Sequence, residues 1–150
     1  MDDPRDAGLI GVAGQIIEPT AAEQGWIAGY VEAAGDLAAR LVPGVTEPLT
    51  VDDLDAVWAA WLATDPAPAE ANGVVHAIGL AFGQLLVDEL GLRWVVVDEE
   101  DGIEAAVQDE AGSDTLLFPA SFVAEFWGTR ATGILRPARD ELARVVSYGR

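Results

Sequence analysis

The chain has 150 residues, 51% of them hydrophobic, and a formal net charge of −18 at pH 7. This length fits one domain and the apolar content suffices for a core, so the composition argues against a disordered chain. There is no cysteine and all eight basic residues are arginines, which excludes disulfides, thiolate nucleophiles, lysine Schiff bases and lysine-dependent phosphate loops.

The charge is unevenly placed along the chain. Residues 130–150 carry five arginines against Asp140 and Glu141, whereas residues 1–129 hold 24 acids and three arginines. Such an acidic field repels nucleic acid and anionic lipid, so we expect neither as a partner. A lysine-poor or salt-adapted composition explains the acidity without a function, and the alternative is a partner protein with a basic face.

The N-terminal residues carry acids where a secretory signal needs basic residues. No apolar stretch approaches the roughly 20 residues that span a bilayer. Together with the absence of cysteine, this predicts a cytoplasmic protein. We expect residues 1–150 to form a single domain in which residues 1–19 are disordered or only loosely attached, and the sequence leaves the oligomeric state open.

Two amphipathic helices come first. Thr20 and Glu23 are spaced as a capping box, apolar residues follow at helical spacing, and the Pro-Gly pair at 43–44 ends the helix. A second start, the segment TVDD at 50–53, precedes another apolar stripe. The Asp-Pro pair at 65–66 ends that helix, because a residue before proline disfavours the helical conformation. The segment DPAPAE then reads as a short linker.

A central helix is predicted over residues 72–90, with Gly91 at its end. Apolar side chains occupy nearly its whole circumference, which predicts burial on several sides. Gly79 and Gly83 lie on one stripe with His76 beside it, and each helical glycine costs about 1 kcal/mol relative to alanine. Close approach of another backbone or of a Trp ring explains these glycines best, and a ligand against the bare backbone is the alternative.

The periodicity then changes to that of strands. Residues 92–110 predict a hairpin whose turn ends at the Asp-Gly pair 101–102, with a half-exposed second strand. A further turn at 112–114 and a third strand at 115–119 complete an antiparallel three-stranded meander. A short helix over 120–127 follows.

The last helix, over residues 136–146, has an apolar face of Leu142, Val145 and Val146. We expect that face to dock onto the domain, with the arginines directed towards neighbouring acids. The order is therefore α+β: N-terminal helices, a central glycine-containing helix, a small antiparallel three-stranded meander and a C-terminal helix.

Few residues suggest chemistry. His76, the only histidine, lacks the spaced partners of a metal or triad motif, so we expect a core or rim histidine that hydrogen-bonds a carbonyl. The acids 98–101 could attract a divalent cation, but their spacing is not that of a calcium loop, and a solvated turn is the simpler interpretation. No serine lies in a nucleophile motif. Trp26, Trp58 and Trp61 lie on apolar helix stripes and are expected in the core.

The segments 72–107 and 116–127 resemble an uncharacterised bacterial domain-of-unknown-function family, number 3806. The matching positions are Gly79, Gly83, Gly91, Trp94, Val95, Val96, Asp98, Gly102, Phe118 and Pro119. The resemblance spans roughly residues 72–127, with the two preceding helices as a variable lead-in. A Lys-Arg pair is common in that family shortly after Phe-Pro, where this chain has Glu125-Phe126, so an anion site formed by that pair would be missing here. The resemblance implies a fold unit and no catalytic residue.

These observations favour a protein-interaction or regulatory module over an enzyme, for example an immunity-type antagonist of a basic partner. The alternative is a hydrolase-like enzyme that uses a divalent cation at the turn 98–101. We predict no catalytic residue, cofactor or metal site. The candidate interaction surface is Asp98, Glu99, Glu100 and Asp101, and the residues predicted to be structural are Gly79, Gly83, Trp94, Phe118 and Pro119.

Overall fold

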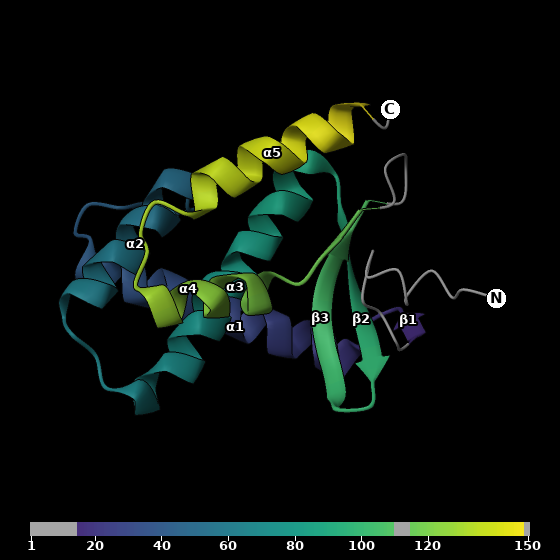
Figure 1. The fold of residues 1–150 in the computed structure, drawn as a ribbon, viewed down its shortest axis with the longest axis horizontal. Helices are drawn as coiled ribbons and strands as arrows, with labels where there is room; N and C mark the ends of the chain where they lie inside the picture. Colours follow the sequence, from purple (N-terminus) through teal and green to yellow (C-terminus); the bar gives the residue numbers. More distant parts are fainter. Residues whose placement is uncertain (1–14, 110–114, 149–150) are drawn as a thin grey trace.

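The computed structural model describes residues 15–109 and 115–148, which form five helices and four strands (Figure 1). In chain order the elements are β1 (Gln15–Ile17), α1 (Ala21–Leu41), α2 (Val51–Ala63), α3 (Pro68–Leu90), β2 (Arg93–Glu99), β3 (Gly102–Gln108), β4 (Leu116–Leu117), α4 (Pro119–Thr129) and α5 (Leu135–Tyr148). The predicted α+β class is confirmed, with helices, a hairpin and further helices in the expected order.

α1 begins at the predicted capping box and α2 at the predicted helix start, where the structure shows a second capping box. The Thr20 hydroxyl oxygen accepts the N–H of Glu23 at 3.1 Å, and the Glu23 carboxylate accepts the N–H of Thr20 at 2.8 Å. Thr50 and Asp53 form the same pair of bonds at the start of α2, at 3.1 and 2.9 Å. At the end of α3, Gly91 takes the left-handed conformation with φ 73°. Each of these local signals therefore acts as predicted.

The central helix begins earlier than predicted. α3 begins at Pro68 instead of residue 72, so the second part of the expected linker is helical. Proline is tolerated in the first turn because an N–H there has no acceptor within the helix.

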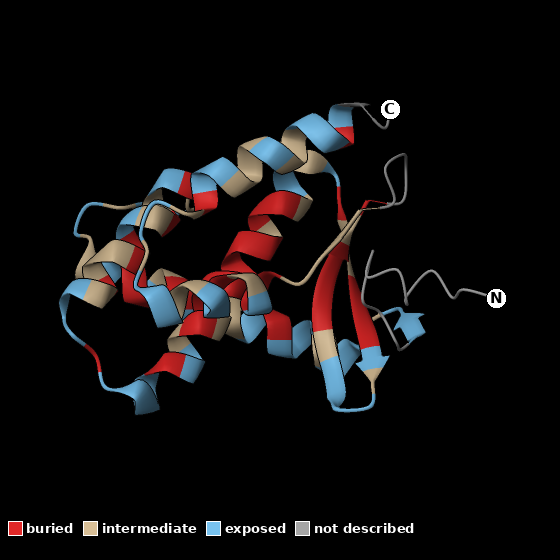
Figure 2. Cartoon of the chain, in the orientation of Figure 1, coloured by how far each residue is buried: buried red, intermediate tan, exposed pale blue. Residues whose placement is uncertain are grey.

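α3 runs through the middle of the domain, and every residue from 77 to 83 is buried (Figure 2). With 23 residues and a mean hydropathy of 1.3 over an 18-residue window, it is long and apolar enough to cross a membrane. The expectation that no apolar stretch approaches that length is therefore wrong. Of that window, 56% is buried inside the protein, as in the core helix of a globular domain.

The sheet has one strand more than predicted. Its order is β1-β2-β3-β4, with antiparallel neighbours, and Ile16 of β1 lies opposite Val97 of β2. The three residues of β1 are all exposed, so no alternation of apolar and polar residues marked this strand in the sequence. Of the segment 1–19 that was expected to be loosely attached, residues 1–14 lie outside the described residues, as does the predicted turn at 112–114.

The second strand of the hairpin is more buried than predicted. Residues 105–107 are buried in succession, whereas alternation would have left every second one exposed. Ala105 packs with Leu80 of α3 on one face of the sheet. Ala106 belongs to a cluster on the other face, which Phe118 helps to cover. Because both faces are covered, the expectation of a half-exposed strand is wrong.

α5 docks against α2 and α3, as the apolar stripe in the sequence predicted. Val146 is buried and Leu142 is half-buried, and Leu135 at the start of the helix adds a fully buried side chain. Val145, however, is 37% exposed, so its assignment to the buried face is wrong. It precedes Val146 by one residue, which turns its side chain by about 100° around the helix axis.

Candidate interaction surface

The four-residue spacing of Gly79 and Gly83 has a steric explanation in the packing of α3. A Cβ atom on Gly79 would lie 2.6 Å from a backbone Cα of α4 and 2.9 Å from the carbonyl oxygen of Pro119. A Cβ atom on Gly83 would overlap the ring of Trp94 and lie 3.0 Å from Cγ of Pro119. Both kinds of neighbour expected from the sequence, a backbone and a Trp ring, are therefore present. They fill the space in which a ligand could have lain against the bare helix.

Trp94 and Phe118 lie on opposite faces of the sheet. The indole Nε1–H of Trp94 donates to the side-chain oxygen of Gln84 at 3.0 Å, which holds the ring over α3. Phe118 packs against the buried cluster that includes Val95 and Val97. The two side chains thus anchor the hairpin from both sides.

His76 lies at the rim of the domain, half-buried. Its Nδ1–H donates to the carbonyl oxygen of Asn72 at 2.8 Å, so the prediction of a histidine bonded to a carbonyl is confirmed. Its ring centroid lies 5.5 Å from that of Tyr30 and 6.3 Å from that of Trp26. The ring belongs to an aromatic cluster between α1 and α3.

The acids of residues 98–101 lie at the turn end of the hairpin. Asp98 and Glu99 end β2, and Glu100 and Asp101 form the turn; all are exposed except the half-buried Glu99. Adjacent residues on a strand point to opposite faces, so these carboxylates diverge. Within residues 15–109 and 115–148, no three side chains of the metal-binding types come close enough to hold an ion. None of the four acids has an ion-pair partner among the residues that the structure describes.

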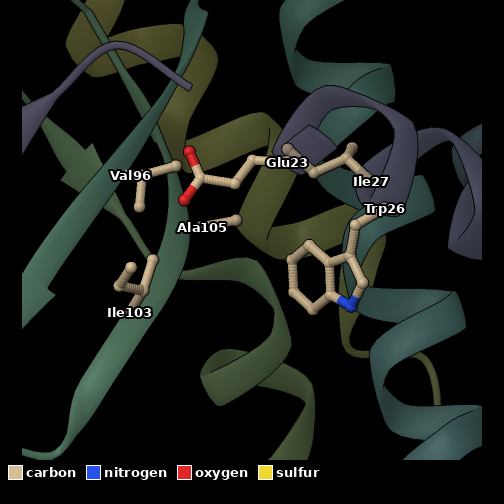
Figure 3. Close-up of a pocket in the computed structure, with 6 residues that line it drawn as sticks. All are labelled: Glu23, Trp26, Ile27, Val96, Ile103 and Ala105. Atoms are coloured by element: carbon tan, nitrogen blue, oxygen red, sulfur yellow. The ribbon is translucent and has the colours of Figure 1, made fainter. Parts of the chain in front are cut away.

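A first hollow of about 200 Å³ lies between α1 and the hairpin (Figure 3). Its lining residues are Glu23, Trp26, Ile27, Val96, Ile103 and Ala105. Trp26 is 44% exposed there and Ile103 is 56% exposed. The expectation that Trp26 is a core residue is therefore wrong, although it holds for Trp58 and Trp61, which are buried. The position of a residue on an apolar helical stripe does not show whether another element of the fold packs over its side chain.

A second hollow, a groove of about 510 Å³, lies between the N-terminal half of α3 and α4. Its α3 wall includes His76 and its α4 wall includes Ser121, Ala124 and Trp127. Ile103 lines this groove as well as the first hollow, so the two are neighbours. Sequence analysis did not identify this surface, because its walls come from three elements, α3, β3 and α4, that are separate in the chain.

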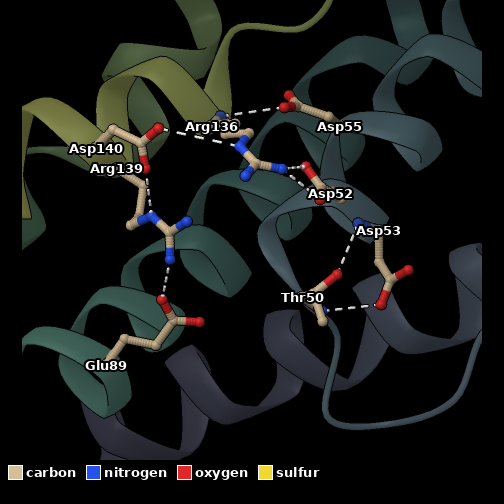
Figure 4. A network of polar contacts seen from close by, with 8 residues as sticks. All are labelled: Thr50, Asp52, Asp53, Asp55, Glu89, Arg136, Arg139 and Asp140. Atoms are coloured by element: carbon tan, nitrogen blue, oxygen red, sulfur yellow. Dashed lines mark hydrogen bonds and ion pairs between the residues drawn. The ribbon is translucent and has the colours of Figure 1, made fainter.

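The arginines of α5 are engaged within the protein (Figure 4). Arg136 pairs with Asp52 of α2 at 2.7 Å, and Arg139 pairs with Glu89 of α3 at 2.6 Å. The hydrogen bond from Arg139 to the Glu89 carboxylate raises the pKa of the arginine above its ordinary value. The Asp55 carboxylate accepts the N–H groups of Leu135 and Arg136 at 2.9 and 3.1 Å. The arginines thus face neighbouring acids, as the sequence predicted.

Comparison with known proteins identifies the family of the chain. A family model described as "Domain of unknown function (DUF3806)" matches residues 53–133. The match begins inside α2 and corrects the expected range of 72–127, so only the first of the two N-terminal helices lies outside it. No curated protein and no solved structure matches the chain. The groove between α3 and α4 lies wholly inside the matched region, whereas the first hollow takes one wall from α1.

Proposed function

The chain belongs to the DUF3806 family, and we propose that it is a protein-interaction module that binds a partner with a basic face. The observation that supports the proposal is which charged side chains have ion-pair partners within the protein. Asp98, Glu100 and Asp101 are exposed and have no ion-pair partner among the described residues. Arg136 and Arg139, by contrast, pair with acids of α2 and α3. A regulatory role, such as that of an immunity-type antagonist, is one use of such a module.

The net charge supports a basic partner over other macromolecules. At −18 the protein repels nucleic acid and anionic lipid and attracts cationic surfaces over about one Debye length, roughly 8 Å at physiological salt. Charges of opposite sign speed up the encounter and disfavour wrong partners. The absence of cysteine supports a reducing compartment, so we place the module in the cytoplasm.

The arrangement of side chains favours binding over catalysis. Nδ1 of His76 is committed to a carbonyl, and the Ser121 hydroxyl donates to the Glu104 carboxylate, so this serine and the histidine are not hydrogen-bonded to each other as nucleophile and base. The carboxylates of the turn 98–101 diverge, and among the described residues no group of three or more His, Asp or Glu side chains could hold a metal ion. The hydrolase-like alternative therefore receives no support from the geometry.

The test is affinity purification from the native cell with a matched pair of charge variants. One variant carries Asp98→Asn, Glu100→Gln and Asp101→Asn. The control removes the same number of charges from exposed acids on the helical side, through Glu32→Gln, Asp36→Asn and Asp65→Asn.

We expect a partner whose capture weakens with added salt and is lost with the turn variant but kept with the control. Equal capture by both variants, or capture insensitive to salt, would contradict the proposal. A captured protein with an acidic surface would do the same.

A further inference from the structure

The two hollows form one binding surface. They share Ile103 in their walls, and Trp26 beside the first contacts His76 beside the second, with ring centroids 6.3 Å apart. The surface runs from α1, past the turn end of the hairpin, into the groove between α3 and α4. Its combined volume, about 200 and 510 Å³ for the two hollows, lies in the range of binding sites and exceeds a single side chain.

Two large apolar side chains stand exposed on this surface. Ile103 is 56% exposed and Trp26 is 44% exposed, the highest values among the exposed large hydrophobic residues of the described chain. Both lie beside hollows instead of on a smooth face, so a partner could bury them by inserting its own apolar groups. Exposed Trp side chains beside a pocket are typical of residues that dominate binding energy at interfaces.

The charge around the hollows has a single sign. Glu23 lines the first hollow and Glu104 the second, and no arginine lines either. Asp98 lies directly opposite Ile103 in the strand register, so its carboxylate stands beside that exposed side chain on the same face. Arg130 lies over the ring of Trp127, which lines the groove, with Cζ 3.7 Å from the ring centroid.

The two glutamates are held in place before any partner binds. Oε1 of Glu23 accepts the N–H of Thr20 in the capping box, and Oε2 of Glu104 accepts the hydroxyl of Ser121. Each carboxylate therefore has one oxygen fixed and the other available as an acceptor. Figure 3 shows the Glu23 carboxylate directed towards Val96 and Ala105, at the edge of the first hollow. Such preorganised acceptors lose little side-chain entropy when they bind a cation.

From this geometry we infer that the surface receives a cationic amphipathic segment of the partner protein. Its apolar side chains fill the two hollows against Trp26 and Ile103, and its Lys or Arg side chains pair with Glu23, Glu104 and Asp98. The inference rests on the proposed function and names the place of contact and the chemistry of the partner. A second copy of the chain is a poor occupant, because it brings another −18 to a surface that is already acidic.

The test uses random peptides displayed on phage and selected on the whole protein at about 0.15 M salt, a level that screens long-range attraction. Enriched sequences are synthesised, and their Kd values are measured for the wild type, Trp26→Ala and Ile103→Ser. The matched control is Val145→Ser, since Val145 is also an exposed aliphatic residue but lies on α5. Ile103 is exposed on its strand, so Ile103→Ser keeps the test valid if Trp26→Ala disturbs the aromatic cluster.

We expect enriched peptides to combine Lys or Arg with Leu, Ile, Phe or Trp. Their Kd should rise about tenfold or more with Ile103→Ser and with Trp26→Ala, and change less than about twofold with Val145→Ser. Glu104→Gln should weaken binding of these peptides by a larger factor at low salt than at high salt, because salt screens the lost attraction.

The outcomes separate the two proposals. If the peptides are cationic and weaken only with the turn variant Asp98→Asn, Glu100→Gln and Asp101→Asn, the groove is not the contact and the proposed function stands. If peptides without cationic residues bind and depend on Ile103, the cationic segment is wrong. If neither set of variants alters binding, both proposals fail.

Discussion

Replacing Gly79 by alanine has two effects of known size, and they change the stability of the protein in opposite directions. Alanine is favoured over glycine inside a helix by about 1 kcal/mol. The new Cβ, however, would lie 2.6 Å from Cα and 2.9 Å from N of Ala120, and 2.9 Å from the carbonyl oxygen of Pro119. These are backbone atoms that cannot rotate away, so α4 must shift as a unit. Overpacking costs about 1–3 kcal/mol, and three close backbone contacts put Gly79→Ala near the upper end. The net change should destabilise the protein by about 2 kcal/mol.

Gly73→Ala is the matched control on the same helix. No atom lies within 4 Å of a Cβ built on Gly73, so this variant gains the helical preference without a clash. The two variants should therefore differ by about 3 kcal/mol in the free energy of unfolding. For a chain of this length 1 kcal/mol shifts Tm by about 2–4 °C, so the two Tm values should differ by roughly 6–12 °C. Thermal melting followed by circular dichroism in one buffer measures the difference.

The outcome that would refute this reasoning is a Gly79→Ala variant that melts at or above the wild type, alongside Gly73→Ala. It would mean that α4 moves away from α3 without cost, so that the close approach does not explain the glycine.

Four further predictions test the docking of α5 and the role of the acids. Asp55→Ala removes the acceptor of two N–H groups at the start of α5 and should cost about 1–2 kcal/mol, while Asp55→Asn should cost less. Hydrogen exchange across residues 138–147 should be slow in the wild type and faster in the alanine variant. Val146→Ala should cost roughly 1–3 kcal/mol and Val145→Ala about 0.5 kcal/mol or less, as seen in melting curves, and equal losses would contradict the observed orientation of the helix. Tm should rise between about 0.01 and 0.1 M sodium or potassium chloride, because the Debye length falls from about 30 to 10 Å; a flat curve would show that the acids do not repel one another appreciably. Mg²⁺, Ca²⁺ and Mn²⁺ at equal ionic strength should give the same Tm, and a rise specific to one ion would support a metal site at 98–101.

Local signals were sufficient for much of the backbone. The capping boxes at Thr20 and Thr50, the left-handed Gly91 and the tight turn before Gly102 each depend on atoms within about four residues. Their hydrogen bonds form inside one turn of helix or one hairpin, so the sequence alone determined where these elements begin and end. The order of the elements then determined the α+β class.

Local sequence signals gave a wrong start for α3 and no indication of β1. Pro66 and Pro68 suggested a linker, yet a proline in the first helical turn costs nothing, so α3 begins at Pro68. β1 has three exposed residues and no alternating pattern, so its pairing with β2 had no signature in the sequence. For β1 the deciding contact is with β2, about 80 residues further along the chain.

The candidate surface was decided by tertiary structure alone. Trp26 lies on the same kind of helical stripe as Trp58, and only the arrangement of α1 beside the hairpin leaves one exposed and the other buried. Ile103 and Ser121 meet in one groove although they come from a strand and a helix. The glycine stripe of α3 predicted a close neighbour but could not say that α4 lies at Gly79 and Trp94 at Gly83. Periodicity gives the direction of a side chain relative to its own element, whereas exposure depends on which other elements pack there, and that is determined by contacts between residues far apart in the chain.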